Sequence, residues 1–168
     1  QQGDDAALRV VLTFFEEAGI VIVAAHDLVP ELLPSEGVLT AVLPTETDKQ
    51  DAARGVELLS LLSPADIGQS CVIARGQSRA VEAQPGTEFM LSSLAHLERT
   101  RGGVFVKAPK VGQDRRVDLP TAGPDTVRLA AEAGLSGLVL VAGGVQMLEP
   151  QLCIASANDA GLFIWVRA

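Results

Sequence analysis

Acidic and basic side chains alternate in the middle of the chain. Residues 107–124 read KAPKVGQDRRVDLPTAGP, with Asp114 and Asp118 on either side of Arg116. If residues 114–118 are extended, these three side chains point to one side, because side chains alternate along a strand. Two carboxylates around a guanidinium can hold a divalent cation and clamp a phosphate group. The pattern therefore predicts a phosphate site at the edge of a cleft, with a surface ladder of ion pairs as the alternative.

The end of the same segment also suits an anion. Gly123-Pro124 predicts the start of a helix, since proline is favoured in the first turn. The free backbone N–H groups of a helix start attract phosphate. Asp125, in the same turn, is the alternative negative charge that this helix start can accept.

Other polar residues give weaker indications. Glu82 and Glu88 flank Pro85-Gly86-Thr87 and read as a strand end and a helix start, with a second acidic cluster as the alternative. His26 and His96 show no spacing of metal ligands.

Two further patterns do not predict a functional site. Asp4 and Asp5 read as helix caps, although the edge of a pocket is possible. Residues 16–20, EEAGI, match the end of a Nudix box, but Leu12-Thr13 stand where that box requires an Arg-Glu pair. We therefore reject the Nudix interpretation.

Composition indicates one compact domain. The chain has 168 residues, 48% of them hydrophobic and only 4% aromatic, and no apolar run reaches the ~18 residues of a membrane span. Cys71 and Cys153 lie far apart in apolar segments, which is typical of buried, reduced thiols. The net charge is −8, yet residues 99–116 hold six basic residues and one acid. This distribution predicts binding of a small anion, and it disfavours nucleic acid or an anionic membrane surface.

Helix-like and strand-like patterns alternate and predict an α/β fold: a single three-layer domain of helices on a mixed, mostly parallel sheet. Residues 30–44, with three prolines, predict a loop with short pieces, and Gly143-Gly144 predicts a hairpin turn. Helices are expected from residue 4 or 5 to 19, from 47 or 48 to 62, and at 87–99, 124–134 and 150–159. Strands are expected at 20–24, 70–75, 78–83, 103–107, 137–142 and 162–166, with a hairpin around Gly76-Gln77.

Residues 107–124 resemble the signature of the LpxI family of UDP-2,3-diacylglucosamine pyrophosphatases. Glu88 and Ala122 depart from the family pattern, in which Asp and a bulkier apolar residue are expected. Shorter matches extend the resemblance over nearly the whole chain: Gly3-Asp4-Asp5, residues 82–87, Arg101-Gly102-Gly103, Ala133-Gly134-Leu135, Ala142-Gly143-Gly144 and residues 160–163.

The resemblance implies a two-domain enzyme in which residues 1–168 are the C-terminal, catalytic-side domain. A Rossmann-like N-terminal domain would lie outside this chain, with the site in the cleft between the two. The implied reaction is the Mg²⁺-dependent hydrolysis of UDP-2,3-diacylglucosamine to UMP and 2,3-diacylglucosamine 1-phosphate (lipid X) in lipid A biosynthesis. The implied location is the cytoplasmic face of the inner membrane, as a peripheral protein.

The resemblance also implies site residues. It places the essential acid at Asp114, with Asp118 as the second choice, and both are candidate Mg²⁺ ligands. Substrate binding is expected from Lys107, Lys110, Gln113, Arg115, Arg116, Thr121 and Gly123.

Several partners and alternatives accompany this reading. Expected partners are the lipid-linked UDP-sugar, the N-terminal domain, the membrane surface and a second copy of the chain, with no nucleic acid. The main alternative is a non-catalytic module that binds or senses a nucleotide sugar or phosphate. A structural or oligomerisation domain is the third reading.

Overall fold

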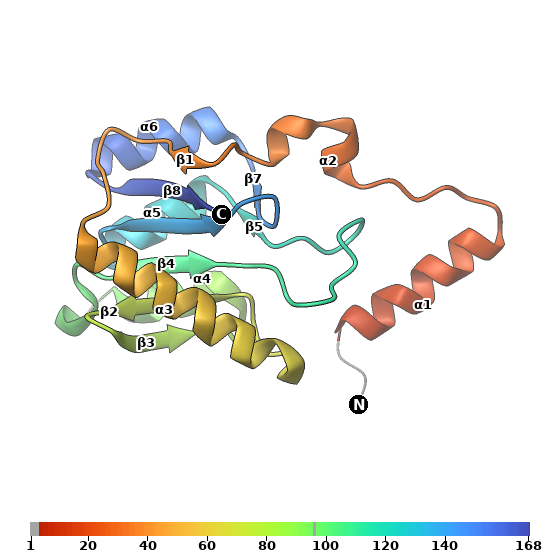
Figure 1. Ribbon diagram of the computed structural model, residues 1–168, viewed down its shortest axis with the longest axis horizontal. Coiled ribbons are helices and arrows are strands. Elements are labelled where there is room, and N and C mark those ends of the chain that lie inside the picture. Colours follow the sequence, from red (N-terminus) through yellow and green to blue (C-terminus); the bar gives the residue numbers. More distant parts are fainter. Residues whose placement is uncertain (1–3, 96) are drawn as a thin grey trace.

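The computed structural model describes residues 4–95 and 97–168, which fold around a mixed sheet (Figure 1). The strands of this sheet lie in the order β1-β8-β6-β4-β2-β3. Their bounds are β1 Gly37–Val38, β2 Ser70–Ala74, β3 Gln77–Val81, β4 Val104–Lys107, β6 Gly137–Val141 and β8 Phe163–Arg167. The central strands β4, β6 and β8 are parallel, and β1, β2 and β3 add antiparallel edges. A separate parallel pair joins β5 (Thr121–Ala122) to β7 (Gln146–Met147).

Helices lie on both faces of the sheet. On one face α3 packs Ala52 and Leu59 against a cluster that includes Val104 and Val106 of β4. On the other face α4, α5 and α6 pack against a cluster that includes Phe105 of β4. Side chains of β4 thus alternate between the two cores, as expected for a strand that is buried on both faces. The helix bounds are α1 Asp4–Glu17, α2 Ala25–Leu28, α3 Glu46–Leu62, α4 Gly86–Leu94, α5 Pro124–Glu132 and α6 Pro150–Ala160, and short 3₁₀ turns cover Pro30–Leu32, Ser63–Ala65 and Glu98–Thr100.

The predicted α/β class and three-layer arrangement are confirmed. The loop predicted for residues 30–44 is also confirmed, and its short pieces are the 3₁₀ turn and β1. The second predicted helix begins after Thr45, whose hydroxyl accepts from the Asp48 N–H while the Asp48 carboxylate accepts from the Thr45 N–H. This reciprocal pair is a capping box, and it places the helix start one or two residues before the predicted one.

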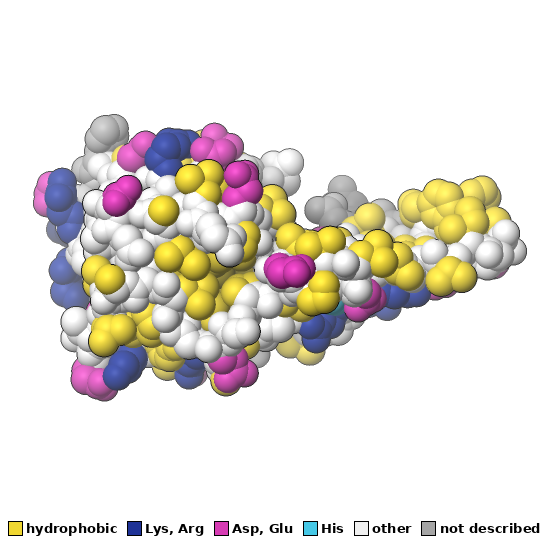
Figure 2. Space-filling model, turned by 90° about the horizontal axis from the view of Figure 1, so that it is seen from above, with side chains coloured by type: hydrophobic (Ala, Val, Ile, Leu, Met, Phe, Trp, Pro, Cys, Tyr) yellow, Lys and Arg dark blue, Asp and Glu magenta, His cyan; other side chains and the backbone are white. Residues whose placement is uncertain are grey.

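One predicted strand is wrong. Residues 20–24 form an irregular connection between α1 and α2, and Val21 is 84% exposed. Figure 1 shows α1 at the end of this connection, away from the sheet, and Figure 2 shows that this end of the molecule projects from the body of the domain as an arm with apolar side chains on its surface. No strand lies beside residues 20–24 in the described part of the chain, so the apolar run has no partner strand and cannot join the sheet.

Smaller differences concern turns and helix ends. The hairpin turn lies at Arg75-Gly76, where both residues have positive φ, one position before the predicted turn. The helix α4 ends at Leu94 instead of Arg99. Gly143-Gly144 is a turn but not a hairpin, because it connects β6 to β7, which pairs with β5 in the other sheet. The caps predicted at Asp4 and Asp5 depend on side chains outside the described part of the structure. His96 also lies outside the described residues.

Candidate active site

Chemistry-bearing residues gather at the carboxyl ends of the parallel strands. Lys107 ends β4, and the segment of residues 108–123 follows it. Because β2 and β3 form an antiparallel hairpin beside β4, Ser70 at the start of β2 and Glu82 just after β3 reach the same edge. In open α/β sheets, ligands bind in the crevice outside the carboxyl ends of the strands.

A buried cation and a carboxylate share one hydroxyl group at this edge. Lys107 is 6% exposed, and its Nζ donates to Thr87 Oγ1 at 2.8 Å. Thr87 Oγ1 donates in turn to Glu82 Oε1 at 2.7 Å. The other Glu82 oxygen accepts from Ser70 Oγ at 2.9 Å and the Gln69 N–H at 3.0 Å. We call Glu82, Thr87 and Lys107 the lysine relay.

The sequence predicted Lys107 as a site residue and favoured a strand end for Glu82 over a second acidic cluster. Burial alone raises the pKa of Glu82, but the charge of Lys107 and three hydrogen bonds outweigh it and lower that pKa. Burial lowers the pKa of Lys107, and the charge of Glu82 opposes this shift. The sequence signal that could have connected the two is the Glu82–Thr87 run itself, which places a carboxylate and a hydroxyl five residues apart around a Pro-Gly turn.

Gln113 joins the hairpin to the loop that carries the acids. Its Oε1 accepts from Gln69 Nε2 at 2.7 Å and from the Lys110 N–H at 3.1 Å. Its Nε2 donates to Asp118 Oδ2. Gln113 is 9% exposed, so its amide is a buried connector whose hydrogen bonds fix the path of residues 110–118.

The expectation that residues 114–118 are extended is wrong. The N–H groups of Val117 and Asp118 both donate to the Asp114 carbonyl, at 3.3 and 3.2 Å, and this closes a turn. The turn forms because the Asp114 carboxylate also accepts from the Arg116 N–H at 3.0 Å, a local bond that competes with extended backbone. Asp114 and Asp118 therefore do not share a strand face.

Asp114 and Arg116 nevertheless form an ion pair through the turn. Arg116 Nε donates to Asp114 Oδ1 at 3.0 Å, and Nη2 donates to Oδ2 at 2.7 Å, a bidentate contact. The side chain of Asp114 is only 16% exposed. Hydrogen bonds from Arg116 lower the pKa of Asp114 to about 2, so this carboxylate is charged at neutral pH.

The helix α1 contacts the same loop. Arg116 Nη1 donates to Glu16 Oε1 at 2.6 Å, and Arg9 Nη2 donates to the Gly112 carbonyl at 2.6 Å. Glu16, part of the rejected Nudix-like sequence, therefore serves here as an ion-pair partner of Arg116. Residues about 100 positions apart in the chain are joined by these two contacts.

The remaining predicted residues lie around the loop in separate roles. Lys110 Nζ pairs with Asp66, and Arg115 Nη2 donates to the Gly143 carbonyl. A Cβ at Gly144 would lie 2.6 Å from Pro109 Cγ, so glycine is required for the loop to pass this close to the turn after β6. Thr121 and Gly123 lie further along the chain, in β5 and at the start of α5.

Neither Thr121 nor Gly123 forms a hydrogen bond with Asp114. Thr121 Oγ1 donates to the Leu119 carbonyl at 3.3 Å, and the Gly123 N–H donates to Thr126 Oγ1 at 3.2 Å. The structure thus connects Lys107, Gln113, Asp118 and the Asp114–Arg116 pair, and it places Thr121 and Gly123 at the periphery.

Two hollows lie near these elements. The first, about 660 Å³, opens beside the lysine relay and includes Glu82 and Lys110 in its wall. Its other lining residues are Asp66, Ile67, Gly68, Gln69, Ala83, Gln84 and Gly86. Asp114 and Asp118 do not line it, so the structure does not place these two acids on the wall of this hollow.

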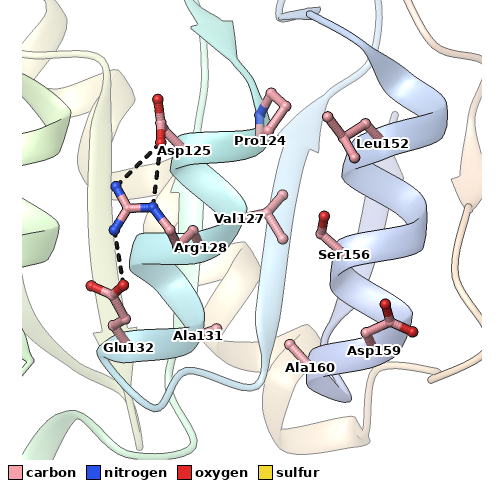
Figure 3. A pocket seen from close by; sticks show the side chains of 10 residues that line it. All are labelled: Pro124, Asp125, Val127, Arg128, Ala131, Glu132, Leu152, Ser156, Asp159 and Ala160. Carbon is pink, nitrogen blue, oxygen red and sulfur yellow. Dashed lines mark hydrogen bonds and ion pairs between the residues drawn. The ribbon is translucent and has the colours of Figure 1, made fainter.

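The second hollow is a groove of about 570 Å³ between α5 and α6 (Figure 3). Val127, Leu152 and Ser156 point into the space between the helices. Arg128 is directed away from it and bonds Asp125 and Glu132, at 3.2 and 2.8 Å. The groove begins at Pro124, directly after Gly123, and its wall is mainly apolar.

Asp114 and Asp118 can supply only some of the ligands that Mg²⁺ requires. Among the described residues, no group of three His, Cys, Asp or Glu side chains is placed to hold a metal ion. Asp114 pairs with Arg116, and Asp118 pairs with Gln113. Mg²⁺ is commonly held by one or two carboxylates together with substrate phosphates and water, and the two acids can supply no more than that.

The cysteines lack the features of nucleophiles. Cys71 and Cys153 are buried free thiols, and burial raises their pKa values to about 12 and about 11. A thiol with such a pKa holds its proton at neutral pH and is a poor nucleophile.

No helix in the ranges 4–95 and 97–168 has the length and hydropathy that a membrane crossing needs.

Together these features define an α/β domain in which charged side chains of both signs gather at the carboxyl edge of its sheet. The profile of the LpxI C-terminal domain matches residues 35–165. The UDP-2,3-diacylglucosamine pyrophosphatase LpxI of Caulobacter vibrioides is 42% identical over 171 aligned residues. This chain therefore belongs to the LpxI family, as its resemblance predicted. The alignment covers 98% of this chain and 61% of the relative, so the chain spans about three fifths of the length of that protein.

Proposed function

We propose that the protein carrying this chain hydrolyses the diphosphate bond of UDP-2,3-diacylglucosamine, giving UMP and 2,3-diacylglucosamine 1-phosphate for lipid A biosynthesis. Water adds across the P–O–P bridge, and one phosphate keeps the bridging oxygen. Family membership and the name of the Caulobacter vibrioides relative support this substrate. The structural observation that carries the proposal is the hydrogen-bonded connection from Lys107 through Glu82, Gln69 and Gln113 to Asp118 at the carboxyl edge of the sheet.

In this proposal the cations bind phosphate and Asp114 acts on water. Lys107, Lys110, Arg115 and Arg116 can neutralise the charge that develops on the phosphate oxygens during P–O cleavage. Asp114 with a pKa of about 2 is a weak base, because efficient general bases have a pKa near the working pH. Its carboxylate is therefore suited to orient the attacking water, and a phosphate that draws Arg116 away would raise the pKa of Asp114 towards its ordinary value.

Mg²⁺ is the cofactor we propose. It would supply a Lewis acid that polarises the phosphoryl oxygens. Asp114 and Asp118 are the residues of this chain proposed to hold it, with phosphate oxygens of the substrate as further ligands.

The proposal extends to the whole protein. A second, Rossmann-like domain would close over the edge that carries the loop of residues 107–118. The proposed location is the cytoplasmic face of the inner membrane, where a peripheral enzyme meets a substrate with two acyl chains. A homo-oligomer is part of the same proposal.

The groove between α5 and α6 is the surface we propose for an acyl chain. Its apolar wall starts at Pro124 and includes Val127 and Leu152, of which Leu152 is 48% exposed. Arg128 pairs with Asp125 and Glu132 and points away from the groove, and Asp159, the fourth charged residue of the lining, is exposed to solvent at one end of α6. Burial of each methylene group favours binding by about 0.8 kcal/mol.

The experiment is a mass-resolved product analysis. The full-length protein is incubated with UDP-2,3-diacylglucosamine and Mg²⁺, and products are separated by mass spectrometry. UMP and lipid X in equal amounts are expected. Recovery of unchanged substrate bound in stoichiometric amount would reject hydrolysis in favour of the binding or sensing module.

A further inference from the structure

The ammonium group of Lys107 is buried without an ion-pair partner among the described residues. Lys107 ends the central strand β4 and is 6% exposed. The one hydrogen bond found for its Nζ in the described part of the structure goes to Thr87, whereas an ammonium group has three N–H donors. Burial of a charge is costly unless the charge is paired and hydrogen-bonded, so this lysine is not explained by stability.

The carboxylate nearest in the hydrogen-bonded network acts through a hydroxyl group. Glu82 accepts from Thr87 at 2.7 Å, and Thr87 accepts from Lys107 at 2.8 Å. Direct contact between Glu82 and Lys107 would occupy the N–H donors of the ammonium group. With one hydroxyl between them, the negative charge supports the ammonium group and leaves donors for a ligand.

The backbone is shaped to hold Glu82 in this position. Gly68 has φ +52°, and a Cβ there would lie 2.0 Å from the Glu82 carbonyl oxygen. This close approach brings the neighbouring Gln69 N–H to the Glu82 carboxylate at 3.0 Å. Ser70 Oγ adds a second donor at 2.9 Å, so the carboxylate is fixed from two sides.

The geometry points to Glu82 and Thr87 as positioning residues that hold the Lys107 ammonium as a charged anchor for a phosphate group of the diphosphate substrate. The inference deepens the proposed hydrolysis and rests on it. Neither Glu82 nor Thr87 needs to touch the substrate. Of the lysine relay, Glu82 lines the hollow of about 660 Å³ together with Gln69 and Lys110, and this hollow provides space for an anion beside the relay.

The inference predicts a particular effect of pH. Burial lowers the pKa of Lys107, and Glu82 is the charged group that opposes this shift. Loss of the Glu82 charge lowers the pKa of Lys107 further, so the ammonium group loses its proton at a lower pH. Phosphate binding that depends on the ammonium group should then fail at a lower pH as well.

The test uses the full-length protein with four substitutions. Glu82→Gln removes the charge, and Thr87→Val removes the hydroxyl that connects it to Lys107. Thr87→Ser keeps that hydroxyl and is the conservative control. Glu88→Gln is the matched charge control, because Glu88 is exposed in the first turn of the same helix, α4. UDP binding and hydrolysis of UDP-2,3-diacylglucosamine are measured from pH 6 to pH 10, together with the thermal midpoint.

Glu82→Gln and Thr87→Val should weaken UDP binding and lower kcat/KM by about tenfold to a hundredfold, the effect of a hydrogen bond to a charged group. In Glu82→Gln the alkaline limb of the kcat/KM profile should move to lower pH, a change that loss of packing does not produce. Thr87→Ser and Glu88→Gln should resemble the parent. If Glu82→Gln does not fold, the Thr87→Val and Thr87→Ser pair carries the test.

Unchanged UDP binding and pH profiles in folded Glu82→Gln and Thr87→Val would overturn the inference, and so would an equal loss in Glu88→Gln. The proposed function fails in a different way, when the parent binds UDP but produces no UMP. The pH dependence of UDP binding tests the lysine relay without any turnover. Failure of the inference can therefore be distinguished from failure of the proposed hydrolysis.

Discussion

Arg116 holds Asp114 by both its backbone and its side chain. Its N–H and Nε lie 3.0 Å from Asp114 Oδ1, and its Nη2 lies 2.7 Å from Oδ2. A lysine cannot reproduce this fork, because it presents a compact charge in place of a planar pair of donors. The orientation of the Asp114 carboxylate therefore depends on one neighbouring arginine.

Arg116→Ala should reduce kcat/KM more than Arg115→Ala, by the equivalent of ~1–3 kcal/mol. Arg116 orients Asp114, whereas Arg115 donates to the Gly143 carbonyl and can be replaced there by water. The measurement is steady-state hydrolysis by both variants of the full-length protein. Arg116→Lys should also fall below the parent. Equal losses in Arg115→Ala and Arg116→Ala would contradict this assignment.

Asp114→Ala should abolish most of the activity and leave the fold intact. A loss on the order of 10²–10⁴ in the single-turnover rate is expected from removal of a group that orients water or metal. The free energy of unfolding should fall by about 1 kcal/mol, the contribution of a partly exposed ion pair with Arg116, because Asp114 lies in a turn outside both cores. Asp118→Ala is the comparison, with an intermediate loss. A folded Asp114→Ala variant with parental turnover would transfer the role to Asp118 or to another part of the protein.

Asp114 should also contribute to stability in acid in a defined direction. Its pKa is about 2 in the folded chain, and an aspartate in an unfolded chain has a pKa of about 3.9. A lowered folded pKa gives stability that is present above about pH 4 and is lost as the pH falls towards about 2. Thermal midpoints of the parent and Asp114→Asn should therefore differ at neutral pH and converge near pH 2. A difference that is constant with pH would show that the ion pair does not stabilise the fold.

Leu152→Asp tests the groove between α5 and α6. The substitution places a charge on the apolar wall, and the KM for a substrate with long acyl chains should rise by about tenfold. A substrate analogue with very short acyl chains should be hydrolysed as before. Leu61→Asp on α3 is the control, since Leu61 is 68% exposed and lies outside the groove. An equal effect on both substrates would mean that the groove does not receive an acyl chain.

Patterns that depend on local sequence predicted most elements of the fold. Pro124 starts α5 and Gly134 follows its end. The buried runs of β4 and β6 were recognisable because strands in the centre of a sheet are mostly apolar, and Lys107 at the end of β4 is the exception. The run Ile20–Ala24 is equally apolar, but no strand of residues 4–95 and 97–168 lies beside it. Periodicity within a segment does not reveal whether a partner lies beside it.

The candidate site was predicted in composition but not in geometry. Residues 114–118 could be extended or turned, and the choice is made by the Arg116 N–H that Asp114 accepts. The connection of Glu82 to Lys107 was not predicted, because Gln69 and Thr87 approach Glu82 only when the hairpin lies beside the start of α4. Contacts of this kind are tertiary, and spacing along the chain does not encode them.

The strand order has a consequence for association between molecules. The two edges of the main sheet are β1, which has two residues, and β3, which carries Arg79 and pairs with β2 through an irregular register. Short edges, inserted charges and bulges are the features that prevent sheets from extending into one another. Both edges are therefore poor templates for strand addition, and we expect the folded domain to resist β-type aggregation even where its apolar side chains are exposed.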